Sequence, residues 1–262
     1  MTETMLQIGD FTIQTRKLSE MLDGLREMQQ AMTLDSLPVI KGLDIQKKCI
    51  RLSTLGGDYF DLFHPVEDNH QCLRVVMGDA CGHDIVSAFL VTDARGMIRM
   101  RSSLPGTISQ IISDVNRQFI ADVNATGHFM TLVYLELDLV TSRLQWVNAG
   151  QDPPIVYDPK NDHFETLDGN SGPAIGVAED TYYTHFSRML ADGQIVVMAT
   201  DGIWEARNPR GRMYGKRRIR QIIRKIADAD ADTILHAILA DQETFAEGES
   251  AHDDRTLVVM KR

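Results

Sequence analysis

Hydrophobic residues recur at helical spacing near the start of the chain. Between Lys17 and Met32 they lie alternately three and four positions apart, which predicts an amphipathic helix, at Leu18, Met21, Leu25, Met28 and Met32. The stripe covers about two heptads and so fits two interpretations, a helix packed on its own domain or the seam of a homodimer. Leu37-Pro38 is expected to end this segment.

Strand patterns predominate from Leu43 onward, and helical patterns occur in pairs between them. We expect strands at 43–52, 72–78, 129–139, 144–148, 155–157, 163–167, 181–190, 195–200 and 255–260. We expect helices at 85–100, 108–123, 216–227 and 233–245, with Asn116 and Arg117 facing outward. The strands between 129 and 167 resemble an antiparallel meander. The pattern indicates an α+β fold, most simply two packed antiparallel sheets with helices outside.

Composition excludes several classes of protein. The 262 residues carry a net charge of −10, with a pI near 5.2, which argues against binding to nucleic acid or an anionic membrane, because both require a positive field. The three cysteines have no C-x-x-C spacing, so neither a disulfide framework nor a thiolate zinc site is indicated. With no secretory signal and no apolar run of membrane-spanning length, a cytoplasmic protein is expected.

Acidic residues stand where predicted strands begin or end. Asp79 follows 75–78, Asp201 follows 195–200, Asp253 precedes 255–260, and Asp58 follows a pair of glycines. Each acid alone could be a helix cap or a turn residue. Together, on rigid strand ends, they could converge at one end of a sandwich and hold Mg²⁺ or Mn²⁺, the hard ions that oxygen ligands select. Two such ions can activate water against a phosphoryl group.

Six ordered segments carry a family resemblance. They are similar to motifs of the metal-dependent PPM serine/threonine phosphatases, which are protein phosphatase 2C-like, in the bacterial SpoIIE/RsbU-like branch. The segments are 56–61, 78–83, 131–150, 172–177, 200–209 and 253–259. The resemblance covers Leu43 to the C-terminus and implies an αββα sandwich. Residues 41–262 would form the phosphatase domain, and residues 1–40 an N-terminal helical segment for regulation or dimerisation.

The resemblance also implies a site with two Mn²⁺ or Mg²⁺ ions. Asp79 would bridge the ions, and Asp79 and Asp201 would be the catalytic residues. Asp254 is a less favoured ligand than Asp253. The implied ligand set is Asp58, Asp79, Ala80 through its carbonyl, Asp201 and Asp253.

Two positions depart from the family pattern. Asp84 stands where glycine is common, and Gln151 where histidine is common. Asp84 has two interpretations, the cap of a helix that begins at Ile85 or an extra carboxylate near the ions. Gln151 keeps its hydrogen-bonding capacity but cannot become cationic. Neither departure removes an implied ligand.

Basic residues gather after Asp201 in an otherwise acidic chain. This cluster is either a solvated helix face or a docking surface for an acidic phosphoprotein. Arg51, which precedes Asp58, and Arg207 are candidate substrate-binding residues. The cluster comprises Arg207, Arg210, Arg212, Lys216, Arg217, Arg218, Arg220, Arg224 and Lys225.

The resemblance implies hydrolysis of phosphoserine or phosphothreonine by metal-activated water. The implied substrate is a phosphorylated STAS-type anti-sigma-factor antagonist in a partner-switching pathway. The sequence lacks a G-x-S-x-G elbow and a G-x-x-x-x-G-K-[ST] loop, in agreement with direct attack by water. Two alternatives are a non-catalytic interaction module with the same fold and a phosphohydrolase for small nucleotides, for which no nucleotide motif is present.

Overall fold

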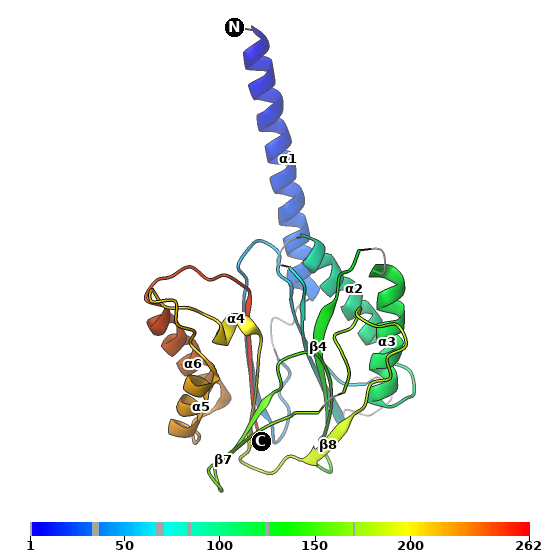
Figure 1. The fold of residues 1–262 in the computed structure, drawn as a ribbon, viewed down its shortest axis with the longest axis vertical. Coiled ribbons are helices and arrows are strands. Elements are labelled where there is room, and N and C mark those ends of the chain that lie inside the picture. Colours follow the sequence, from blue (N-terminus) through cyan, green and yellow to red (C-terminus); the bar gives the residue numbers. More distant parts are fainter. Residues whose placement is uncertain (1, 33–36, 66–70, 83–84, 124–125, 170) are drawn as a thin grey trace.

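Two five-stranded antiparallel sheets form the body of the molecule (Figure 1). The computed structural model describes residues 2–262 except 33–36, 66–70, 83–84, 124–125 and 170. The first sheet has the order β1 (Asp44–Ile50), β10 (Arg255–Lys261), β9 (Ile195–Ala199), β6 (Ile155–Asp158) and β7 (His163–Thr166). The second has the order β2 (Asp58–Phe63), β3 (Cys72–Ala80), β4 (Met130–Asp138), β5 (Arg143–Ala149) and β8 (Phe186–Met189).

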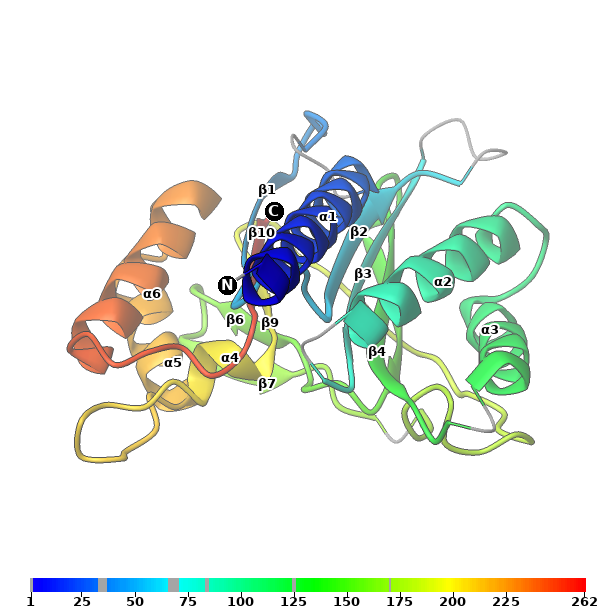
Figure 2. The ribbon, with the colours of Figure 1, turned by 90° about the horizontal axis from the view of Figure 1, so that it is seen from above.

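Helices cover the outer face of each sheet. The second sheet carries α2 (Ile85–Ser102) and α3 (Ile108–Val123), and the first carries α5 (Lys216–Lys225) and α6 (Ala231–Ala246) (Figure 2). The short α4 (Asp201–Trp204) follows β9. This arrangement confirms the predicted α+β fold and its αββα layers. In the part of the chain that is described, none of the helices has both the length and the apolar character that a bilayer crossing requires.

The core consists of three apolar layers because both faces of the central strands are covered. In β3, Val75 and Met77 point between the two sheets, whereas Val76 points toward α2 and α3. In β9, Val196 and Met198 face between the sheets, while Val197 packs under α5 and α6. Burial on both faces explains why these strands are continuous apolar runs in the sequence.

Two strand predictions differ from the structure. No strand is predicted at 58–63, yet β2 begins at Asp58 and all its other residues are buried, so its sequence lacks the alternation that marks a half-buried strand. The strands between 129 and 167 do not form one meander. After β5 the chain crosses to the other sheet, where β6 pairs with β7 and β9.

One side chain predicted to face outward is buried. Asn116 of α3 is 0% exposed. Its Nδ2 donates to the Ala178 carbonyl at 2.9 Å, and its Oδ1 accepts from the Gly176 amide at 3.0 Å. The Gly-rich connection before β8 thus takes its polar partners from α3, which the helical period alone does not reveal.

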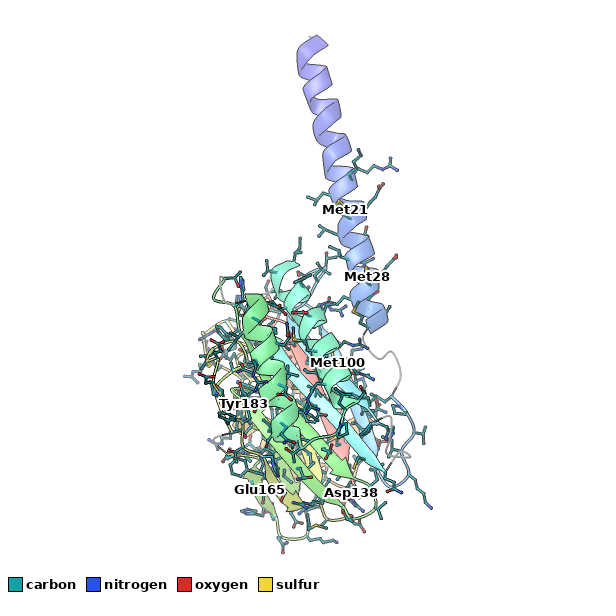
Figure 3. The ribbon with its side chains drawn as sticks, turned by 90° about the vertical axis from the view of Figure 1, so that its right-hand side faces the viewer. Met21, Met28, Met100, Asp138, Glu165 and Tyr183 are labelled. Carbon is teal, nitrogen blue, oxygen red and sulfur yellow. The ribbon has the colours of Figure 1, made fainter. Side chains whose placement is uncertain are left out.

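The N-terminal helix stands away from the domain. Helix α1 (Thr2–Met32) begins earlier than predicted and extends beyond the sheets, with only its C-terminal end near α2 and β2 (Figure 1). Its stripe residues Leu18, Met21, Leu25 and Met28 are 54, 66, 40 and 58% exposed, and Met21 and Met28 lie clear of the domain (Figure 3). Most of the described stripe is therefore not packed on its own domain.

Candidate active site

Four carboxylates come together at one end of the two sheets. Asp58, at the start of β2, is opposite Asp79, near the end of β3, in the antiparallel register. In the other sheet, β9 ends beside the start of β10, so Asp201 follows one strand and Asp253 precedes the other at the same end. The fold thus brings together residues that lie far apart in the sequence.

Two threonines of the first sheet bind Asp58 of the second. The Thr200 and Thr256 hydroxyls donate to Asp58 Oδ2 at 2.8 and 2.6 Å. The Thr200 hydroxyl also accepts from the Thr256 amide at 2.9 Å, which fixes the hydroxyl's orientation. Hydrogen bonds from both threonines therefore hold the Asp58 carboxylate across the interface between the sheets.

Burial and the repulsion between neighbouring charges raise the pKa values of Asp58, Asp79 and Asp201. Burial raises the pKa of Asp58 to about 7, against the lowering effect of the two threonine hydroxyls. The pKa of Asp79 is raised to about 8, first by burial and then by the charges of Asp58, Asp201 and Asp253. Burial and the charge of Asp253 also raise the pKa of Asp201. A bound cation would lower these pKa values again, because it favours the ionised forms of the carboxyl groups.

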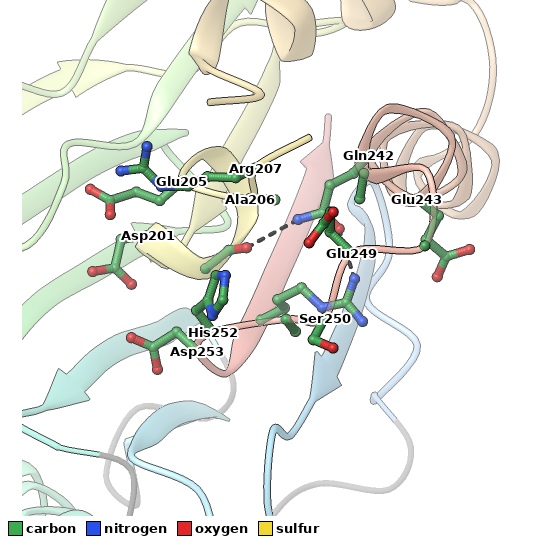
Figure 4. Close-up of a pocket in the computed structure, with 15 residues that line it drawn as sticks. Asp201, Glu205, Ala206, Arg207, Gln242, Glu243, Glu249, Ser250, His252 and Asp253 are labelled. Atoms are coloured by element: carbon green, nitrogen blue, oxygen red, sulfur yellow. Dashed lines mark hydrogen bonds between the residues drawn. The ribbon is translucent and has the colours of Figure 1, made fainter. Parts of the chain in front are cut away.

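The donor set fits a hard divalent cation in its chemistry. The four side chains offer only oxygen, and Asp201 Oδ1 is buried without a hydrogen-bond partner. The Asp201 and Asp253 side chains project toward the same side of the pocket (Figure 4). In the described ranges, no group of three or more His, Cys, Asp or Glu side chains is arranged so that it could hold an ion.

Asp254 supports the loop that leads into β2. It is 2% exposed; its Oδ1 accepts from the Leu52 amide and its Oδ2 from the Gly57 amide, both at 2.7 Å. A Cβ at Gly57 would lie 2.6 Å from the Gly82 carbonyl oxygen and 3.0 Å from that of Ala80, so only glycine fits there. Both oxygens of Asp254 are occupied by backbone donors, a role that sequence reasoning missed.

The candidate substrate-binding arginines flank this end of the sheets. Arg51 packs against the site loop, because a Cβ at Gly56 would lie 3.2 Å from Arg51 Cγ and Cδ. Arg207 lines a pocket of about 310 Å³ together with Asp201 and Asp253 (Figure 4). The structure thus places Arg207 in one pocket with Asp201 and Asp253, and Arg51 next to Gly56.

The two departures from the family pattern have different outcomes. The Gln151 Oε1 accepts from the Thr131 hydroxyl, and Thr131 is opposite Asp79 in the pairing of β3 with β4. Gln151 is therefore linked through one residue to the strand that carries Asp79. Asp84 lies outside the described residues, as does His83, so its two interpretations stay as predicted.

Most of the basic residues on α5 are engaged within the domain. Lys216 pairs with Asp152, Arg218 with Asp241, and Arg224 with Asp162. Arg220 and Arg224 also lie over the ring of Phe164. This part of the basic cluster thus serves mainly to attach α5 to its neighbours.

Comparison with known proteins adds family relationships. Residues 69–262 match the family model described as Stage II sporulation protein E (SpoIIE). The chain is 26% identical over 239 residues to phosphoserine phosphatase RsbU of Bacillus subtilis, an alignment that covers 90% of this chain and 68% of that protein.

Solved structures agree in fold. The SiaA-PP2C domain of Pseudomonas aeruginosa is similar with a TM-score of 0.80 at 20% identity, over 95% of this chain and 98% of that one. The RsbU and RsbW domains of Rv1364c from Mycobacterium tuberculosis give a TM-score of 0.73 at 23% identity, over 87% of this chain. The match spans 63% of the Rv1364c chain, less than two thirds of its length.

Proposed function

The chain belongs to the SpoIIE family, in the RsbU branch of the PPM serine/threonine phosphatases, and we propose that it hydrolyses phosphoserine or phosphothreonine in a protein substrate with two Mn²⁺ or Mg²⁺ ions. The observation that carries this proposal is the convergence of four carboxylates from both sheets at one end. Asp58 and Asp79 have pKa values raised to about 7 and 8, as expected for clustered, buried carboxyl groups whose ionised forms a bound cation would stabilise.

The proposed ligands follow the strand ends. Asp79 would be shared between the two ions, Asp58 and the Ala80 carbonyl would hold one of them, and Asp201 and Asp253 would hold the other. When bound, such ions lower the pKa of a water molecule and neutralise charge on the phosphoryl group. Support comes from the buried, unpartnered Asp201 Oδ1 and from the pairing of Asp58 with Asp79.

The chain's own residues orient this set. Thr200 and Thr256 hold one oxygen of Asp58, which leaves its other oxygen for a ligand role. The Ala80 amide donates to the Gly57 carbonyl at 3.0 Å, which ties the end of β3 to the loop that Asp254 supports. Arg207, in the pocket beside Asp201, is proposed to contact the substrate phosphate, and Arg51 to assist from the glycine loop.

The proposed substrate is a phosphorylated STAS-domain anti-sigma-factor antagonist. Two relationships support it: the similar protein RsbU is a phosphoserine phosphatase, and the similar Rv1364c structure contains an RsbU domain and an RsbW domain. The family motifs of the sequence point to the same pathway. Dephosphorylation of this antagonist would act through partner switching, in which the antagonist changes its binding partner.

The N-terminal segment, residues 1–40, is proposed to regulate the phosphatase domain, residues 41–262, and to form a homodimer through α1. Gln29 is 6% exposed. Its Nε2 donates to the Gly56 carbonyl at 2.7 Å, and its Oε1 accepts from the Gly56 amide at 3.2 Å. A displacement of α1 would therefore act directly on the loop before Asp58.

A cytoplasmic location is also part of the proposal. The three cysteines, Cys49, Cys72 and Cys81, are all free thiols. Free thiols are typical of a reducing compartment.

Substitution of the proposed bridging ligand tests the enzyme. We expect Asp79→Asn to lower Mn²⁺-dependent release of phosphate from a phosphoserine protein by at least about a hundredfold, because a shared ligand would lose its charge. Asp228→Asn, an exposed carboxylate on the α5–α6 turn, serves as the matched control and should retain full activity.

Two outcomes would contradict the proposal. Equal turnover by wild type and Asp79→Asn would exclude the proposed metal centre. Wild-type protein that binds no Mn²⁺ in calorimetry at millimolar metal, and releases no phosphate, would favour the non-catalytic interaction module instead.

A further inference from the structure

We propose that the segment 205–215, here called the basic loop, is a docking surface for an acidic stretch of the phosphoprotein substrate; this inference rests on the proposed phosphatase function. The basic loop connects α4 to α5 at the end of the sheets where the carboxylates lie (Figures 1 and 2). It carries Arg207, Arg210 and Arg212.

The basic loop has a defined internal structure. The Asn208 Oδ1 accepts from the amides of Arg210 and Arg212 at 3.1 and 3.0 Å. Arg207 and Met213 form an antiparallel bridge, and the Arg207 Nη1 donates to the Gly211 carbonyl at 3.0 Å. The two central arginines are thus presented from an ordered turn, and binding would cost little backbone entropy.

The charges of the basic loop are available to a partner. Arg210 and Arg212 are exposed, and in the described part of the chain neither side chain forms an ion pair. The α5 residues Lys216, Arg218 and Arg224 are paired instead. The docking role is therefore assigned to the basic loop and not to α5.

The basic loop adjoins the candidate active site. Glu205, Ala206 and Arg207 line the same pocket as Asp201 and Asp253, and Figure 4 shows Arg207 on the same wall as Glu205. A polypeptide whose phosphate reached the carboxylates would therefore have chain on either side of its phosphoserine within reach of the loop.

The three arginines of the basic loop favour an acidic partner. The chain carries a net charge of −10, so an acidic phosphoprotein would be repelled by the molecule as a whole and attracted only by a local positive surface. Met213, 47% exposed within the same loop, offers an apolar contact that a protein surface can use and a free anion cannot. The occupant that fits is an acidic protein segment.

Charge reversal tests the docking surface. Two synthetic phosphoserine peptides, one flanked by Asp and Glu and one by Lys and Arg, are compared with p-nitrophenyl phosphate as substrates of the full chain. We expect Arg210→Glu/Arg212→Glu to lower kcat/KM for the acidic peptide about tenfold, mainly through KM, and to leave p-nitrophenyl phosphate turnover unchanged. The effect should shrink as salt is added.

A matched control variant and a binding assay test whether the lower kcat/KM comes from weaker docking on the basic loop. Lys160→Glu/Lys225→Glu reverses two exposed charges outside the loop and should leave all three substrates unaffected. Binding of the acidic peptide to Asp79→Asn protein, measured by fluorescence anisotropy, should also weaken about tenfold with the loop substitutions, so docking is tested even without turnover. An unchanged affinity, or an equal loss with p-nitrophenyl phosphate, would overturn the proposal.

Discussion

Asp58 and Asp79 face each other across two neighbouring strands, and each keeps its proton to a higher pH than an exposed carboxyl. Their pKa values are raised to about 7 and 8, whereas an unfolded chain releases these protons near about pH 4. The folded state thus binds more protons than the unfolded state between these limits. Its free energy of unfolding must fall as the pH rises through this window.

This linkage predicts a pH-dependent gain of stability from removing one charge. In EDTA, we expect the melting temperature of the wild type to fall between pH 5 and pH 8, and that of Asp79→Asn to fall less, so their difference grows with pH. Added Mn²⁺ should restore the wild type only. Thermal unfolding across the pH range measures this. Asp79→Asn protein no more stable than wild type at pH 8 would contradict it.

At the scale of elements, an ion pair between a buried carboxylate and a partly exposed arginine joins α2 to β2. Asp61 of β2 is 0% exposed and accepts from Arg99 Nε and Nη2 of α2 at 2.6 and 2.5 Å. Tyr59 and the Leu62 amide donate to the same carboxylate, and the Arg99 guanidinium lies 4.2 Å from the ring centroid of Phe63. The helix that follows the Ala80–Gly82 loop is therefore attached to the strand that begins with Asp58.

Removing one partner of this ion pair should destabilise the fold more than replacing both partners by apolar residues. We expect Arg99→Met to lower the free energy of unfolding by about 3 kcal/mol, because it removes the two hydrogen bonds from Arg99 to the buried Asp61 charge and leaves it with the more distant Arg95, at 3.8 Å. The double variant Asp61→Leu/Arg99→Met should recover most of the loss. Urea unfolding followed by circular dichroism measures both. A double variant no more stable than Arg99→Met would contradict this account of the pair.

At the scale of the whole molecule, α1 leaves an apolar stripe uncovered. Gln29 attaches the C-terminal end of the helix to Gly56, while Leu18, Met21 and Leu25 are 40% exposed or more. Apolar residues at alternating spacings of three and four are typical of a two-stranded seam. A second copy of the same helix would cover the stripe and leave the Gln29 contact in place.

Light scattering tests the dimer. We expect wild-type protein to have twice the chain mass of 29.4 kDa, and Met21→Glu/Leu25→Glu protein to have the mass of one chain, because paired glutamates would be buried in the seam. Glu27→Gln, an exposed change on the same helix, should remain dimeric. A wild-type mass of 29.4 kDa at high concentration would exclude the seam.

The sequence by itself determined the fold class, the order of most elements and the identity of the acids at the strand ends. Hydrophobic period and motif order carry this information because each depends on neighbours along the chain. The helix at 108–123 coincides with α3 for the same reason. Its period could not reveal that Asn116 is buried, because the groups it binds, at Gly176 and Ala178, come from a distant connection.

Only the tertiary structure decided how those residues meet. The threonines that hold Asp58 are 142 and 198 positions away, and Asp254 reaches the Gly57 amide across 197 positions. The sequence does not predict β2, because both faces of that strand are buried and its residues therefore do not alternate between apolar and polar. Hydrogen bonds and charge pairs between segments far apart in the sequence depend on how the two sheets pack, and no local pattern along the chain records that packing.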